Sequence, residues 1–351
     1  ELIGWNINTN IAIGSFNFDL APVIIVAFFT ALLVMGTKIG ARVDGALTIL
    51  KIAIVVFIVV VGFFYIKAEN FTPFIPPSEP AASTDGSGVS AVMEQPLWQW
   101  ATGMAPSIYG VTGIISGAAL VFFAFLGFDV VATASEETIN PKKNVPLGIG
   151  VGLGLIIVLY TLVAIVTTGM VSYKDLAKQS DPSLAVAFKM VGADWAAKII
   201  SLGIVIGMAT VVMVLLLGLT RVVFAMSRDG LLPRGLSHTG KHGTPVRLQI
   251  IVGVVMALIA ACCNVGILSD MVNIGTLSAF TLVAISIPIM RKKRPDLERS
   301  FKIPGNPWVP ILIALANLWL MVNLSVLTWI RFVVWLIVGF AIYFGYGYRH
   351  A

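Results

Sequence analysis

The sequence predicts an all-α integral membrane protein, built as a single domain over residues 1–351 with nine transmembrane helices. Hydrophobic residues make up 58% of the chain and charged residues 11%, whereas a soluble domain is roughly one quarter charged. Apolar runs of about twenty residues, the length that crosses a bilayer, recur along the chain. The runs lack the alternation of period two that marks membrane strands, and helices satisfy their own backbone hydrogen bonds in lipid.

Nine apolar runs define the predicted helices, and loops rich in charged or turn-forming residues separate them. The net charge of +6 resides in these loops, which argues against a nucleic-acid partner. The runs comprise residues 21–36, 44–66, 111–135, 146–170, 197–225, 248–264, 269–290, 309–327 and 330–348.

The basic residues predict the orientation in the membrane. Sixteen of the 23 Lys and Arg residues fall in the loops on one side and in the C-terminus, six fall on the other side, and Lys51 lies inside a run. Because basic loops mark the cytoplasmic face, we expect a multi-pass protein of the plasma or inner membrane with a cytoplasmic C-terminus.

Two segments between the runs have their own character. Residues 67–110 include a stretch rich in Pro, Ser and Gly, which predicts an extracellular loop. Residues 173–195 show a short helical periodicity, which predicts an interfacial helix on the same side.

The third apolar run contains Gly127 and, two residues later, Asp129. A glycine among aromatic residues in a membrane helix can mark an unwound turn, whose free carbonyls accept hydrogen bonds from an ammonium group. Alternatively, Gly127 only allows two helices to pack closely. Asp129 is a candidate binding residue, because a carboxylate facing lipid is costly and requires a partner or water.

The second apolar run contains Lys51, which has apolar neighbours on both sides. Seven residues beyond Asp44, it lies about 10 Å into the hydrocarbon at a rise of ~1.5 Å per residue. An ammonium at this depth can release its proton, so Lys51 could couple proton movement to transport. The alternative is a lysine whose stem extends back to the interface.

Residues for catalysis or metal binding are not apparent. His238 and His242 stand four residues apart, without a Cys or an acid at ligand spacing. No nucleophile is paired with a base, so we expect neither an enzyme nor a metal site.

Three stretches carry a family resemblance: FFAFLGFDVVATASEETINPKKNVPLGI (122–149), TRVVFAMSRDGLLP with KHGTPVRLQ (220–233 and 241–249), and DMVNIGTLSAFTLVA (270–284). They resemble the amino acid-polyamine-organocation superfamily of amino acid permeases, and within it the cationic amino acid transporter branch. This resemblance implies the leucine-transporter fold of twelve helices, whose first ten form two inverted repeats of five. The nine runs would then be helices 4–12, and we expect the chain to lack the first three.

The resemblance also implies the roles of individual residues. The main-chain carbonyls of Phe123, Ala124 and Leu126 would receive the amino group of the substrate, with Gly127 at the break. Lys51 falls where proton-coupled relatives keep a lysine, and Thr210 would lie near it.

The expected function is therefore secondary active transport of an amino acid across the bilayer, by proton-coupled symport or by exchange. Protons are the coupling ion and no other cofactor is expected. The alternative is a non-transporting or partner-dependent membrane subunit, whose partner the sequence does not identify.

Overall fold

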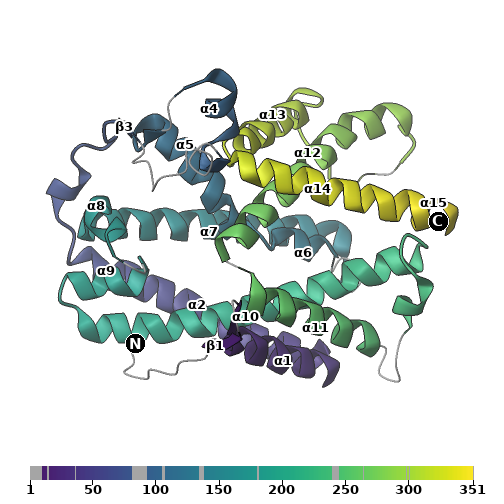
Figure 1. The fold of residues 1–351 in the computed structure, drawn as a ribbon, viewed down its shortest axis with the longest axis horizontal. Coiled ribbons are helices and arrows are strands. Elements are labelled where there is room, and N and C mark those ends of the chain that lie inside the picture. Colours follow the sequence, from purple (N-terminus) through teal and green to yellow (C-terminus); the bar gives the residue numbers. More distant parts are fainter. Residues whose placement is uncertain are drawn as a thin grey trace.

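The computed structural model describes residues 10–13, 16–35, 37–80, 93–104, 107–133, 138–179, 182–238, 245–263, 265–297, 299 and 301–350. Helices dominate this part of the chain, and the long ones run roughly side by side (Figure 1). The helices are α1 (Leu20–Met35), α2 (Thr37–Phe63), η1 (Ala68–Phe71), α4 (Leu97–Thr102), α5 (Gly110–Val121), η2 (Phe122–Phe125), α6 (Phe128–Thr133), α7 (Pro141–Met170), α8 (Tyr173–Ala177), α9 (Leu184–Met190), α10 (Asp194–Arg228), η4 (Arg234–Ser237), α11 (Val246–Cys262), α12 (Val265–Lys293), α13 (Trp308–Val322), α14 (Val326–Ile342), the π-helical turn η5 (Tyr343–Gly347) and α15 (Tyr348–His350).

Helix forms most of the described part of each predicted apolar run, so the helical membrane class is confirmed. In the described residues, six segments are long and apolar enough to cross a membrane, and three further apolar helices are shorter. The count of nine spans and the inverted-repeat fold therefore stay predictions. The six segments are Gly45–Phe63, Gly110–Ala132, Pro141–Met170, Asp194–Arg228, Val265–Lys293 and Val326–His350, and the shorter helices are Pro22–Val34, Val246–Cys262 and Trp308–Val322.

Two short antiparallel strand pairs, which the sequence analysis did not predict, accompany the helices. Strand β1 (Asn10–Ile13) pairs with β2 (Phe16–Asp19), and β3 (Glu79–Pro80) pairs with β4 (Ser107–Ile108). Strands of two to four residues leave little pattern in a sequence, since alternation needs more positions to become visible.

The largest apolar core lies where α2, α7, α9 and α10 meet. Phe188 of α9 and Ile200 of α10 are fully buried there, together with Val166 of α7. Gly62 allows α2 to join them, because a Cβ at this position would collide with Val166. The close approach of these four helices fixes the position of α2, which carries Lys51.

Two further cores involve the remaining helices. Val26 and Phe29 of α1 pack with Met213 of α10, and α11 contacts α1 through Gly253, where a Cβ would collide with Thr30. The third core joins α5, α12 and α13 and extends to the residues just before α14; it consists of Ala119, Ile274, Leu277, Met321 and Leu324. This third core holds α5 against α12.

The predicted outer loop contacts the short helix α8 through residues that the structure describes. Lys174 of α8 forms an ion pair of 2.7 Å with Glu79, and this hydrogen bond raises the pKa of the lysine above its usual value. In α9, Ala185, Ala187 and Phe188 are buried against the helical core. The segment 173–195 is thus helical in two short pieces, and its placement in the membrane interface stays a prediction.

Candidate functional site

The apolar run that contains Gly127 is not one continuous α-helix. Helix α5 ends at Val121, η2 follows, and Leu126 adopts an extended conformation with ψ of 147°. Gly127 has φ of 114°, which L-residues with a side chain rarely adopt. A Cβ at Gly127 would have no atom of the described residues within 4 Å. The backbone conformation, rather than close helix packing, therefore explains the glycine.

Two of the predicted carbonyl acceptors at this interruption have donors within the protein. The carbonyl of Ala124 accepts a hydrogen bond of 3.0 Å from the hydroxyl of Tyr160 on α7. The carbonyl of Phe123 accepts one of 3.2 Å from the amide of Leu126. A carbonyl oxygen has two lone pairs, so either group retains the capacity to accept a second donor.

Tyr160 is a residue that the sequence analysis missed. Its ring also packs edge-on against Phe125, with the ring centroids 5.2 Å apart. Its position inside an apolar run was the available signal, since a tyrosine there needs a partner for its hydroxyl. The sequence could not identify that partner, which lies 36 residues away.

Asp129 belongs to α6, one residue after the helix begins at Phe128. Its side chain lies outside the described part of the structure. Its role as a binding residue therefore stays a prediction.

Lys51 lies at the contact between α2 and α10, the helix that carries Thr210. The Lys51 side chain runs over Gly207, where a Cβ would be 3.6 Å from the lysine Cδ. One turn further along α10, Thr210 is fully buried and its hydroxyl donates a hydrogen bond of 2.8 Å to the Gly207 carbonyl. The structure thus places Lys51 beside the segment that contains Thr210.

Helix α10 also links this contact to the interrupted helix. A Cβ at Gly218 would be 3.0 Å from Val130 of α6, so α6 packs closely on α10. Gly207 and Gly218 are eleven residues apart, about 16 Å along the helix axis at ~1.5 Å per residue. Helix α6, which carries Asp129, and Lys51 of α2 therefore contact α10 at separate positions.

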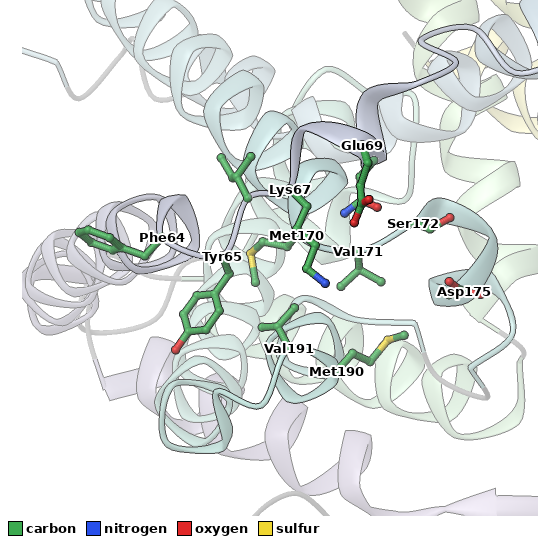
Figure 2. Close-up of a pocket in the computed structure, with 12 residues that line it drawn as sticks. Phe64, Tyr65, Lys67, Glu69, Met170, Val171, Ser172, Asp175, Met190 and Val191 are labelled. Carbon is green, nitrogen blue, oxygen red and sulfur yellow. The ribbon is translucent and has the colours of Figure 1, made fainter.

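A distinct pocket of about 550 Å³ opens at the ends of α2 and α7. Figure 2 shows its lining side chains, which include Tyr65, Lys67, Glu69 and Met170. Lys67 and Glu69 are exposed. Neither the interruption at Gly127 nor Lys51 contributes to this lining, so the pocket is separate from the candidate site.

The described residues contain no group of three His, Cys, Asp or Glu side chains that could hold a metal ion. His242 lies outside the described residues.

Membrane-length helices, one of them interrupted at a glycine within its apolar run, are a feature that many membrane transporters share. Comparison with known sequences identifies the family. The chain belongs to the amino acid permease family, which it matches over residues 6–344. This family comprises transporters rather than enzymes, and the resemblance to the amino acid-polyamine-organocation superfamily is confirmed.

Several curated relatives match most of the chain. It is 39% identical over 335 residues to the methylthioribose transporter and 40% identical over 335 residues to the branched-chain amino acid permease BcaP, both of Bacillus subtilis. It is 34% identical over 281 residues to cationic amino acid transporter 3, mitochondrial, of Arabidopsis thaliana. The matches cover 95% of the chain and 65% of either bacterial relative, and 80% of the chain and 42% of the plant relative.

Proposed function

We propose that this protein is a secondary active transporter of amino acids that binds its substrate at the interrupted helix between Val121 and Phe128. The observation that carries the proposal is the break at Leu126 and Gly127 within a chain of the amino acid permease family. Among the relatives, one is named for methylthioribose, one for branched-chain amino acids and one for cationic amino acids. An amino acid is the substrate class that two of these three names share.

The proposed contact is between the substrate ammonium group and the carbonyls of Phe123, Ala124 and Leu126. A helix interruption frees carbonyls that a continuous helix would use internally, and an ammonium is a donor of three hydrogen bonds. The positive φ of Gly127 supports this arrangement, because it turns the chain sharply directly after these residues. Asp129 would add a negative charge close to the same turn.

Uptake by reconstituted protein tests this proposal directly. The purified chain is placed in liposomes, and entry of labelled leucine and labelled arginine is measured against empty liposomes. We expect saturable uptake that an excess of unlabelled amino acid abolishes. Absence of saturable uptake for amino acids of every class would contradict the proposal and favour a partner-dependent subunit.

We further propose that uptake is coupled to protons through Lys51, with Thr210 as its neighbour on α10. The position of the lysine stem over Gly207, within the contact between two membrane helices, supports this role.

Replacement of Lys51 by alanine is expected to abolish uptake driven by a pH gradient while amino-acid exchange continues at zero gradient. The reason is that exchange requires substrate binding but no net movement of protons. Gradient-driven uptake and counterflow are measured in the same liposomes. Lys67→Ala, which removes an exposed lysine just beyond the end of α2, serves as the matched control. Unchanged gradient-driven uptake in Lys51→Ala would refute the coupling role.

A further inference from the structure

Helix α12 contacts the broken helix immediately before the interruption. The side-chain amide of Asn273 donates a hydrogen bond of 3.2 Å to the carbonyl of Leu120, in the last turn of α5. Asn273 is fully buried, and its neighbours Ile274 and Leu277 are packed against Ala119 of α5. This end of α5 is therefore fixed to α12 by both a directional and an apolar contact.

The same helix also reaches across the interruption. Phe280 lies seven residues after Asn273, about 10 Å further along α12 at ~1.5 Å per residue. Its ring contacts Phe122, before the break, with centroids 6.1 Å apart, and Phe128, after the break, with centroids 5.2 Å apart. One helix thus contacts both halves of the broken helix.

The chemistry of Asn273 indicates a role beyond packing. Among the described residues its Oδ1 is buried and has no hydrogen-bond partner. An unpaired buried polar atom is unfavourable, and a leucine of similar size would avoid it. The amide donor to Leu120 is the interaction that a leucine could not provide.

We propose that Asn273 and Phe280 are positioning residues, which hold the two halves of the broken helix so that the carbonyls between them converge on the substrate ammonium. This inference rests on the proposed function. Neither residue needs to touch the substrate.

Three substitutions test Asn273 and Phe280 in reconstituted protein. Asn273→Leu removes the donor and keeps the volume, and Phe280→Leu removes the ring. Phe280→Tyr retains the ring and should therefore behave like the wild-type protein. Because the contacts act on binding geometry, we expect Asn273→Leu to raise KM about three- to tenfold, the effect of losing one neutral hydrogen bond, with little change in kcat.

The matched control is Asn317→Leu. Asn317 is also a buried asparagine with an unpartnered atom, its Nδ2, but it belongs to α13. If Asn273 acts only through general packing, both asparagine variants will lower the yield of folded protein alike and leave KM unchanged. That result would overturn the inference.

A second measurement does not depend on transport. Hydrogen–deuterium exchange of the amides of residues 122–130 should become faster in Asn273→Leu and Phe280→Leu, and should stay at the wild-type rate in Asn317→Leu and Phe280→Tyr. Wild-type exchange in the first two variants would refute the positioning role. If wild-type protein takes up no amino acid, the proposed function fails, and exchange still decides whether α12 holds the break.

Discussion

Gly127 combines a backbone conformation that other residues rarely adopt with free space around its Cα. Gly127→Ala should therefore act through backbone strain, with a cost on the order of 1–3 kcal/mol, and not through a clash. We expect a lower melting temperature and weaker substrate binding, measured by thermal unfolding with and without amino acid. Strain would be relieved if the chain at residues 126–127 became more helical.

The control for this variant is Gly117→Ala in α5. Gly117 also has open space around its Cα, but it lies within a regular helix. Alanine is favoured over glycine in a helix by about 0.5–1 kcal/mol, so Gly117→Ala should be neutral or slightly stabilising. Equal effects of the two variants would contradict the strain argument.

Tyr160 bears on the proposed site through its hydroxyl. Tyr160→Phe removes the donor to the Ala124 carbonyl and keeps the ring against Phe125. If the hydroxyl orients this peptide group toward the substrate, its loss should weaken binding by about 0.5–1.5 kcal/mol, which appears as a higher KM. Tyr65→Phe, in the separate pocket, should leave KM unchanged, and an unaltered or lower KM for Tyr160→Phe would oppose the assignment.

The residues that the sequence reveals are those that violate the pattern of an apolar run. Lys51 and Gly127 attract attention for this reason. Asn273 and Phe280 do not stand out in the same way. The tyrosine at position 160 signals only that its hydroxyl needs a partner, without identifying that partner. The roles of these three residues come from contacts between residues distant in sequence, such as the 153 residues that separate Asn273 from Leu120.

Among the helices, α2 depends most visibly on a glycine for its packing. A Cβ at Gly62 would be 2.9 Å from the sulfur of Met170 and 3.2 Å from the ring of Phe188, besides colliding with Val166. Overpacking of such a core typically costs about 1–3 kcal/mol, so Gly62→Ala should lower the melting temperature. Gly45→Ala, near the other end of α2, meets no atom within 4 Å among the described residues and should not. Equal stability of the two variants would contradict the packing argument.

Hydropathy locates the helices well but not their ends or interruptions. The run that begins near residue 44 belongs to a helix that already begins at Thr37, because a charged turn outside the hydrocarbon can continue a helix. The run at 111–135 contains an α-helix, a 3-10 turn and a second α-helix. These divisions depend on hydrogen bonds and φ values, and the mean hydropathy of a run does not reflect either of them.

For the molecule as a whole, the unequal distribution of basic residues predicts which face meets the cytoplasm. A cysteine at position 292 should be labelled only from inside the cell, and one at position 74 from outside. The background for this experiment lacks the native Cys262 and Cys263, both of which are exposed. Labelling of intact cells with a membrane-impermeant maleimide measures the orientation. Reaction at Lys292→Cys but not at Phe74→Cys in intact cells would show that the orientation is the reverse of the predicted one.

The family and the helical class could be predicted from the sequence because each depends on many residues at once. Motifs at three places along the chain indicate the family, and repeated apolar runs indicate the helical class. The orientation of the chain in the membrane also depends on the lipids and on the membrane potential, and neither of these is part of the folded protein. Orientation and coupling therefore remain predictions that only experiments in membranes can test.

The position of Lys51 over Gly207 sets a limit on how this protein can be stabilised. A larger residue at position 207 would fill the junction of α2 and α10 and restrict the lysine stem at the same time. Under the proposed coupling role of Lys51, thermostabilising substitutions at this junction would then reduce the response to protons in exchange for rigidity, a trade-off familiar from sites that require motion. Evolution toward heat resistance would have to strengthen other helix contacts and leave this glycine small.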